Sequence, residues 1–231
     1  MKNYLIIGGS SGIGKALTEK LAKEGHQVFA TFNQHKPQVE RSNITYASLD
    51  VLEDEMNLDF LPESIQGLVY CPGSINLKPF SRIKPTSFAE DYQLQVIGAI
   101  KVIQTVLPKL KSAKNASILL FSTVAVQTGF QFHAQVSASK GAIEGLTRSL
   151  AAEFAPAIRV NAIAPSLTDT PLASKLLGTD EKREANAQRH PLKKIGSPEE
   201  IAEAAAFLLS EGASWTTGQI MHIDGGMSAI K

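Results

Sequence analysis

Cysteine is almost absent from this sequence of 231 residues, since Cys71 is the only one. A single cysteine excludes an intrachain disulfide and a metal site built from several cysteines, and no metal site is predicted. No apolar run approaches the roughly 20 residues that a membrane-spanning helix needs, and glycines cut the apolar start of the chain too short for a signal peptide. The net charge is only +1, without a basic stripe interleaved with aromatics, which argues against nucleic acid as a partner. We therefore expect a cytoplasmic protein that acts on a small molecule.

The bulk composition is that of an ordinary globular domain. Hydrophobic residues make up 43% of the chain and charged residues 19%, close to the usual proportions. A chain of this length can bury most of its unfolded surface without disulfides or metals to hold it together. We expect one domain that spans residues 1–231.

The stretch 4–22 predicts a strand that turns through glycines directly into a helix. Tyr4–Ile7 is a short apolar run, and from Ile13 the apolar residues follow helical spacing. The free N–H groups and the dipole at a helix start favour an anion, and glycines let a diphosphate approach the backbone. A glycine-rich turn is weak evidence alone. Because the strand and helix are both in place, the stretch indicates a nucleotide-binding site.

The spacing Gly8-x-x-x-Gly12-x-Gly14 resembles the Thr-Gly-x-x-x-Gly-x-Gly signature of the short-chain dehydrogenase/reductase family, with Ile7 in place of the threonine. The resemblance extends over essentially the whole chain. It implies an α/β fold, a Rossmann-type doubly wound parallel sheet with helices on both faces in a single domain. It also implies a set of cofactor-binding residues, which are Gly8, Ser10, Ser11, Gly12, Ile13, Gly14, Lys15, Asn33, Asp50, Val51, Cys71, Pro72, Gly73, Lys140, Pro165, Thr168 and Thr170.

The end of the second strand predicts the type of dinucleotide. That strand is expected at Gln27–Phe32, and residues 29–38 contain no acid. An Asp or Glu there would bind the ribose 2′-OH of NAD and repel the 2′-phosphate of NADP. Lys15, directly after the last glycine, adds a basic group where NADP-preferring members of the family often have one. The predicted cofactor is therefore NADP(H).

Two further segments resemble cofactor-binding elements of the family. Leu49-Asp50-Val51 is similar to an Asp-Val element whose acid faces the adenine amine. Cys71-Pro72-Gly73 stands where the family usually has Asn-Ala-Gly. We interpret Cys71 as a small buried side chain rather than a reactive thiol, because no cationic partner is apparent in the sequence.

Residues 53–123 contain two expected catalytic positions, Gln95 and Thr123. Residues 53–64 are expected to form a short helix or a loop, and the periodicity of Phe88–Leu110 predicts one long helix. Within that helix, Gln95-x-x-Gly98 resembles the family's Asn-x-x-Gly, whose asparagine holds a proton-relay water. A strand is expected at Ser117–Thr123, and Thr123 matches the serine that hydrogen-bonds the substrate carbonyl.

The catalytic Tyr-x-x-x-Lys of the family is incomplete in this chain. Thirteen residues after Thr123 the sequence reads Val136-Ser137-Ala138-Ser139-Lys140, so the lysine is present and the tyrosine is not. By the resemblance, Lys140 still binds the nicotinamide ribose. Three alternatives remain open for the proton. The first is His133, which stands seven residues before Lys140, a spacing that resembles the enoyl-reductase branch of the family. The second is a water ordered by Gln95, Thr123 and Lys140. The third is that catalysis has been lost.

The last third of the chain is expected to complete the cofactor site. Pro165–Thr170 resembles Pro-Gly-x-x-x-Thr, with Ser166 in place of the glycine, and would bind the nicotinamide carboxamide through Thr168 and Thr170. Residues 167–195 stand where the family has its substrate lid. Ser197-Pro198-Glu199-Glu200 predicts a capping box at the start of a helix that reaches Ser210. In the family, the helix of 88–110 and the helix after 136 form dimer faces, so a homo-oligomer, a dimer or tetramer, is expected.

Together these features predict an NADPH-dependent oxidoreductase that reduces a carbonyl by hydride transfer, with an atypical proton donor. A 3-oxoacyl thioester is one candidate substrate. The alternatives are a catalytically silent NADP-binding module, which would act as a sensor or assembly partner, and an enoyl-type reductase that uses His133.

Overall fold

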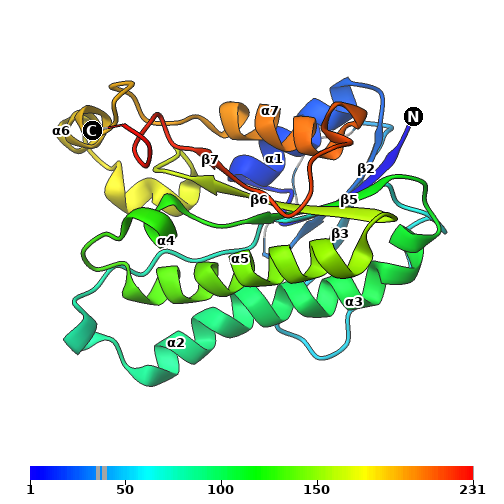
Figure 1. The fold of residues 1–231 in the computed structure, drawn as a ribbon, viewed down its shortest axis with the longest axis horizontal. Coiled ribbons are helices and arrows are strands. Elements are labelled where there is room, and N and C mark those ends of the chain that lie inside the picture. Colours follow the sequence, from blue (N-terminus) through cyan, green and yellow to red (C-terminus); the bar gives the residue numbers. More distant parts are fainter. Residues whose placement is uncertain (35–36, 38–40, 231) are drawn as a thin grey trace.

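A seven-stranded sheet, parallel throughout, forms the centre of the protein (Figure 1). The computed structural model describes residues 1–34, 37 and 41–230. The strand order is β3-β2-β1-β4-β5-β6-β7, so the direction of winding reverses between β1 and β4. The strands are β1 (Asn3–Ile7), β2 (Gln27–Phe32), β3 (Ile44–Ser48), β4 (Gly67–Tyr70), β5 (Ala116–Phe121), β6 (Ile158–Pro165) and β7 (Ile220–Ile223).

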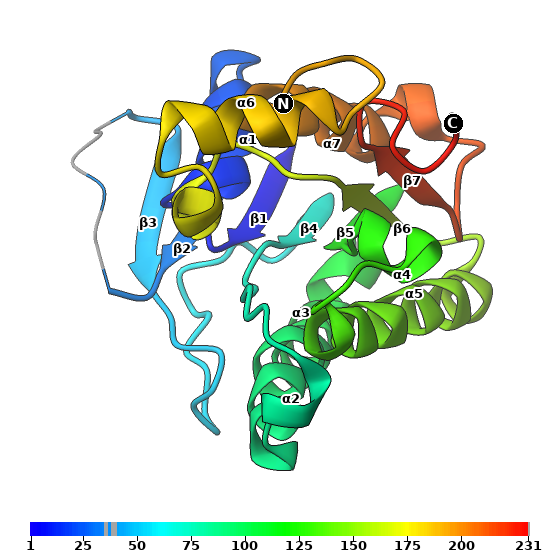
Figure 2. The same cartoon turned by 90° about the vertical axis from the view of Figure 1, so that its left-hand side faces the viewer.

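Helices cover both faces of the sheet (Figures 1 and 2). α1 (Gly12–Lys23) and α7 (Pro198–Leu209) pack side by side on one face, and α3 (Gly98–Lys111) and α5 (Ala134–Phe154) lie on the other. The remaining helices are α2 (Pro85–Tyr92), α4 (Val124–Thr128) and α6 (Asp180–Gln188), with 3-10 turns at Phe80–Arg82, Pro171–Leu176 and Glu211–Ala213. The predicted fold, a doubly wound parallel sheet in one domain, is confirmed.

Alternation along the strands divides the core into two layers. On β1, Leu5 and Ile7 join the layer under α3 and α5, whereas Tyr4 and Ile6 join the layer under α1 and α7. Successive side chains of a strand point to opposite faces, and a strand covered on both faces needs apolar residues at every position. This explains why the strands read as short continuous apolar runs.

The long helix predicted over residues 88–110 is confirmed as a continuous helical run, residues 85–111, with a π-helical segment inside it. α2 ends at Tyr92, and a π-helical segment, Gln93–Ile97, separates it from α3. The Tyr70 hydroxyl, from the end of β4, donates to the Leu94 carbonyl at 2.6 Å. A Cβ at Gly98 would collide with that hydroxyl. A side chain that inserts into the hydrogen-bond ladder of a helix is a recognised cause of such irregularities.

Three other segment boundaries can be compared with the sequence. Residues 53–64 form a loop, one of the two expected forms. The strand expected at Ser117–Thr123 is wrong at its end, since β5 stops at Phe121 and Thr123 becomes the N-cap of α4. The predicted capping box at Ser197 is present, with both reciprocal hydrogen bonds to Glu200.

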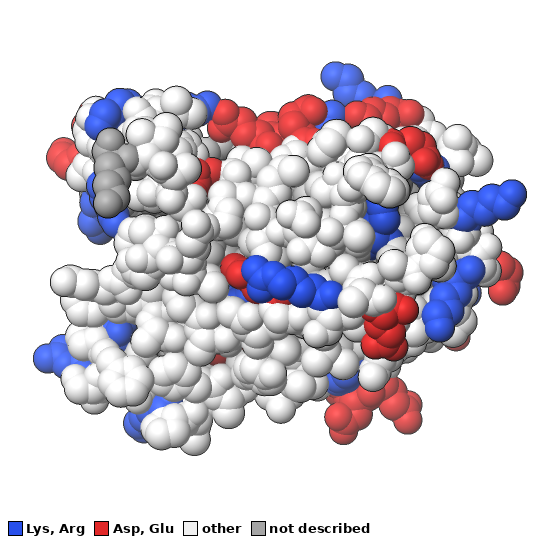
Figure 3. All heavy atoms as spheres, viewed as in Figure 1, with Lys and Arg blue, Asp and Glu red and all other residues white. Residues whose placement is uncertain are grey.

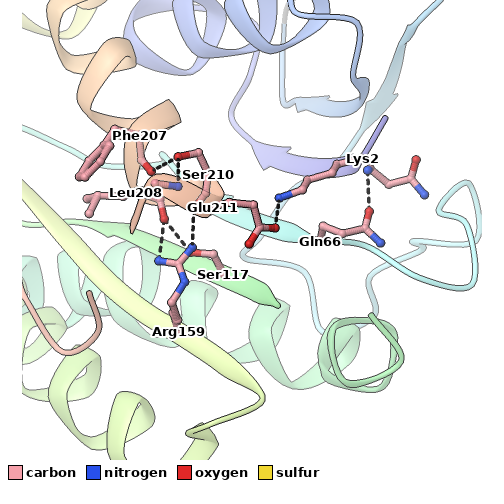
Figure 4. Close-up of polar contacts among 10 residues, drawn as sticks. Lys2, Gln66, Ser117, Arg159, Phe207, Leu208, Ser210 and Glu211 are labelled. Atoms are coloured by element: carbon pink, nitrogen blue, oxygen red, sulfur yellow. Dashed lines mark hydrogen bonds and ion pairs between the residues drawn. The ribbon is translucent and has the colours of Figure 1, made fainter. Parts of the chain in front are cut away.

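Arg159 fastens the end of α7 to the amino ends of the central strands (Figure 4). Its guanidinium donates to the carbonyls of Leu208 at 2.9 Å and Ser210 at 3.2 Å. The last carbonyls of a helix have no partner within it, and here an arginine at the start of β6 supplies one. An ion pair between Lys2 and Glu211, 2.7 Å long and largely exposed, lies next to it.

The surface carries mixed charge. On the face in Figure 3, acidic side chains gather along the upper edge, basic and acidic side chains are scattered elsewhere, and no continuous basic patch covers the described residues there. In the part of the chain that the structure describes, no helix is long and apolar enough to cross a membrane.

We expect Arg159→Leu to lower the free energy of unfolding by about 1–3 kcal/mol, because it removes the guanidinium donor from the Leu208 and Ser210 carbonyls, each of which keeps another, uncharged donor. Lys2→Ala, which removes only an exposed ion pair, is the matched control and should cost less than about 1 kcal/mol. Urea denaturation of both variants measures the difference. Equal losses would contradict the role assigned to Arg159.

Candidate active site

A cavity of about 770 Å³ opens at the carboxyl ends of the strands. Its walls come from the turn after β1, the end of β2, the segments after β4, β5 and β6, and the residues between Leu167 and His190. It includes the point where the strand order reverses between β1 and β4. Ligands of open α/β sheets bind at this kind of switch point, and the volume is within the range of small-molecule sites.

The glycine turn after β1 forms one end of the cavity. Gly8 and Gly12 have φ values of 78° and 50°, a region that favours glycine. A Cβ at Gly14 would overlap the Gly8 carbonyl oxygen, so only glycine lets α1 pack so close to β1. Ser11 is the N-cap of α1 but its side chain makes no capping hydrogen bond. Among the described residues no side chain caps the N–H groups at the helix start, and the turn fits the diphosphate of a dinucleotide.

Most of the site residues expected from the sequence line this one cavity. They are Gly8, Ser10, Ser11, Gly12, Ile13, Gly14, Asn33, Cys71, Pro72, Gly73, Gln95, Thr123, His133, Lys140, Pro165, Thr168 and Thr170. The structure therefore brings together residues from five strand ends and from α5, although they are spread over more than half of the sequence.

Three expected cofactor-binding residues do not line the cavity. Lys15 is exposed on α1, where its ammonium lies 3.8 Å from the Glu19 carboxylate. Asp50 accepts a hydrogen bond from the Leu52 backbone at 2.9 Å, and Val51 is buried in the core. His35 and Lys36, which contribute to the acid-free stretch after β2, lie outside the described residues.

Lys140 is buried in α5 with its ammonium near Gly73. Burial lowers its pKa to about 8, while the negative charge of Asp91 opposes the shift. Lys140 is also the cationic neighbour that Cys71 was expected to lack, so that reason for the Cys71 interpretation is wrong. Burial nevertheless raises the pKa of the Cys71 thiol to about 12 against the effect of Lys140. The thiol stays protonated at neutral pH, as an unreactive side chain would.

Asp91 is a site residue that the sequence analysis missed. Its carboxylate, 4% exposed, accepts hydrogen bonds from the Gln95 amide at 2.7 Å and the Ser139 hydroxyl at 2.5 Å. The Ser74 hydroxyl donates to its other oxygen. The one sequence signal was the i, i+4 spacing of Asp91 and Gln95 in a helical stretch.

Gln95 presents an unused acceptor beside Lys140. Its amide nitrogen is held by Asp91, and its Oε1 is buried without a hydrogen-bond partner among the described residues. A Cβ at Gly73 would lie 3.3 Å from that oxygen and 3.7 Å from the Lys140 ammonium. Gly73 therefore leaves room for both groups, and the Gln95 oxygen can accept from a water or a ligand hydroxyl.

Position 136, where the family has tyrosine, gives the cavity an apolar wall. Val136 is buried and lines the cavity. Thr123 accepts a hydrogen bond from the Ala125 backbone at 3.3 Å, which leaves its hydroxyl proton available to donate. The cavity thus retains a hydroxyl at Thr123 and a cation at Lys140, without the tyrosine.

His133 lines the cavity, but its ring contacts residues of the loop that precedes α5. It is the N-cap residue of α5, two helical turns before Lys140. Its Nδ1 lies 2.7 Å from the Gln131 carbonyl oxygen, and its ring packs against Phe130 with centroids 5.5 Å apart. Within the described residues, no hydrogen bond joins the His133 ring to Thr123.

A second histidine in the cavity was also missed. The Nε2 of His190 lies 2.8 Å from the Ser166 hydroxyl, and its Nδ1 lies 2.9 Å from the Asn186 carbonyl oxygen. All three residues line the cavity. The substitution of serine for the family's glycine at position 166 was the only signal in the sequence.

The lowered pKa of Lys140 predicts a pH-dependent stability difference between the unaltered protein and Lys140→Met. Between about pH 8 and the ordinary lysine value, the unfolded chain holds a proton that the folded chain has lost. Stability therefore rises with pH relative to the variant across this window. The free energy of unfolding of the unaltered protein, measured relative to that of Lys140→Met, should rise by about 2 kcal/mol from pH 7 to pH 9.5.

Urea denaturation at the two pH values measures this change. Lys15→Met, which removes an exposed ammonium, provides the control. A difference between Lys140→Met and the unaltered protein that does not vary with pH would contradict the assigned environment.

The comparisons with known proteins agree with this geometry. The family model described as enoyl-(acyl carrier protein) reductase matches residues 8–228. The uncharacterized oxidoreductase YmfI of Bacillus subtilis is 31% identical over 97% of this chain and 98% of its own length. The 3-oxoacyl-[acyl-carrier-protein] reductase FabG of Aquifex aeolicus is 32% identical over 98% of this chain and 97% of its own.

Solved structures show the same relationship. The ligand-free aldohexose dehydrogenase of Thermoplasma acidophilum superposes with a TM-score of 0.92 at 28% identity, over 100% of this chain and 95% of that one. ElxO with NADP bound superposes with a TM-score of 0.90 at 26% identity, over 98% of this chain and 99% of that one. With matches along the full length of the chain and a cavity at the expected switch point, the protein belongs to the short-chain dehydrogenase/reductase family.

Proposed function

We propose that the protein is an NADPH-dependent reductase of carbonyl compounds, of which 3-oxoacyl thioesters are one candidate class, with an atypical proton donor. The observation that carries the proposal is the single cavity that joins the glycine turn to Thr123, Gln95 and Lys140. A buried lysine and a buried, hydrogen-bonded carboxylate are both costly to bury, and their presence beside this cavity supports a working site over a silent one.

The cofactor preference rests on the end of β2. Asn33 and Gln34 line the cavity there, and neither carries the negative charge that would repel a 2′-phosphate. The structural likeness to ElxO with NADP bound supports the same cofactor. When bound, the reduced dinucleotide supplies hydride.

The residues around the reacting carbonyl have distinct tasks in this proposal. The Thr123 hydroxyl donates to the carbonyl oxygen and orients it. Lys140 binds the nicotinamide ribose, and its positive charge favours negative charge that develops nearby. Gln95, fixed by Asp91, holds a water through its free oxygen. Residues 167–195 form the lid, because Leu167, Leu172 and Leu176 line the cavity.

The assembly proposed is a homo-oligomer that uses α3 and α5. These two helices lie on the same face of the sheet. Gly145, in the middle of α5, is exposed with open space around it, which would let a second copy approach closely.

We expect Val136→Tyr to raise the rate of carbonyl reduction by less than the roughly 10²–10⁴-fold that a proton donor is worth, because it adds a donor in the place where the family has one to a site that already has an atypical donor. Val136→Phe, which adds the same ring without the hydroxyl, is the matched control and should not raise it. Turnover is measured as NADPH oxidation with a panel of ketones, 3-oxoacyl thioesters and enoyl thioesters. A protein that binds NADPH but reduces nothing until Val136→Tyr is introduced would be the silent module instead.

Asn33→Asp should weaken NADPH binding at least about 10-fold and leave NADH binding within about 3-fold, because it places a carboxylate beside the 2′-phosphate. Asn33→Ala removes the amide without adding charge and serves as the control. Calorimetric titration with both dinucleotides provides the measurement. If the carboxylate leaves NADPH binding unchanged, the 2′-phosphate is not bound at this strand end.

A further inference from the structure

The Ser166–His190 pair is a built polar site inside the cavity. The His190 side chain is 3% exposed. Because the Asn186 carbonyl can only accept, the Nδ1 of His190 must carry a hydrogen. The protonation state of Nε2 is then the only variable of the ring, and Nε2 faces the Ser166 hydroxyl at 2.8 Å.

Both charge states of His190 satisfy this geometry. In the neutral ring, Nε2 accepts a hydrogen bond from the Ser166 hydroxyl. In the cationic ring, the Nε2 hydrogen donates to the Ser166 oxygen, and the hydroxyl hydrogen is free to point into the cavity. A pair that accommodates either state without moving a side chain can pass on a proton.

The pair lies next to the proposed reaction centre. Ser166 directly follows β6, whose neighbour in the sheet is β5, and Thr123 follows β5. The Ser122 backbone donates to the Ile163 carbonyl at 2.7 Å, so the two strand ends stay paired up to that point. Ser166, Thr123 and Lys140 line the same cavity. Ser166 therefore lies on the strand end next to the one that carries Thr123, on the same cavity wall where a carbonyl oxygen would be held.

The charged groups around His190 are engaged elsewhere. On its own turn, the Arg189 guanidinium lies 5.6 Å from the Phe130 ring centroid and the Lys193 ammonium donates to the Gln188 carbonyl. On the segment after β6, Asp169 is paired with Arg183. On the turn after β7, Asp224 accepts from the backbone of Gly226 and Ser228. Among the described residues, none of these groups bonds the His190 ring.

We infer that Ser166 and His190 form the proton relay that replaces the missing tyrosine. The inference rests on the proposed carbonyl reduction. Hydride addition to the carbonyl carbon moves the C=O π pair onto oxygen. The resulting alkoxide takes the Ser166 hydroxyl proton, while the Ser166 oxygen takes the Nε2 proton of cationic His190. The products are an alcohol, an intact serine and a neutral histidine, which solvent reprotonates. Ser166 is the catalytic residue, and His190 acts through it.

The test compares steady-state kinetics of Ser166→Ala, His190→Gln and the double variant with the unaltered protein. We expect each single change to lower kcat about 100-fold or more, with KM and the NADPH dissociation constant within about 3-fold. The double variant should be no slower than the slower single variant, because the two residues act as a unit. His222→Gln, which changes a histidine outside the cavity lining, is the control.

The pH profile separates a relay from a purely structural contact. Reduction by the unaltered protein should slow as the pH is raised, because the relay delivers its proton only from cationic His190. The residual activity of His190→Gln should lack that dependence. Adding Val136→Tyr to Ser166→Ala should restore turnover by an independent donor.

The outcomes separate the relay from the proposed function. If the unaltered protein binds NADPH but reduces no carbonyl, both fail. If it reduces a carbonyl and Ser166→Ala does so equally fast, only the relay is overturned. A loss that falls entirely on KM or on NADPH binding would also overturn the relay, since it would make the pair a structural link between the lid and β6.

Discussion

The buried carboxylate of Asp91 is the charge on which the polar side of the cavity depends. It is almost inaccessible to water and accepts from Ser74, Gln95 and Ser139, which belong to the loop after β4, the π-helical segment and α5. A buried charge is tolerated only when such donors surround it. One acid therefore couples three segments and holds the Gln95 amide so that its oxygen stays free beside Lys140. The ionised carboxylate also supports the protonated form of Lys140, against the effect of burial.

Local patterns predicted much of the fold. The bounds of β2, the glycine turn and the capping box at Ser197 all depend on residues within a few positions of one another. The π-helical segment between α2 and α3 does not. It is caused by the hydroxyl of Tyr70, 24 residues from Leu94, and the hydrophobic periodicity of residues 88–110 continues through it. Periodicity reports which face of a helix is buried, and it is insensitive to a single displaced hydrogen bond.

The expected site residues belong to local motifs, whereas the missed ones depend on contacts between segments that are distant in sequence. Residues that match a motif were located by the resemblance, and most of them line the cavity. Asp91 and His190 belong to no motif, and their partners Ser139 and Ser166 are 48 and 24 residues away in sequence. Lys15 matches the motif but does not line the cavity, and its exposed ammonium lies 3.8 Å from the Glu19 carboxylate, so its contact with a cofactor stays a prediction. Hydrogen-bonded pairs between distant segments can be identified only from the three-dimensional structure.

The two hydrogen bonds of the His190 ring have an energetic consequence for any proton that passes through it. Each ring nitrogen already faces an oxygen, whether the ring is neutral or cationic. The surrounding dipoles were oriented when the chain folded, so a change of charge on the ring demands little rearrangement of its partners. In water, the solvent would have to reorient around the new charge. The reorganisation energy for moving a proton at this position is correspondingly small, because the fold already holds the surrounding dipoles in place.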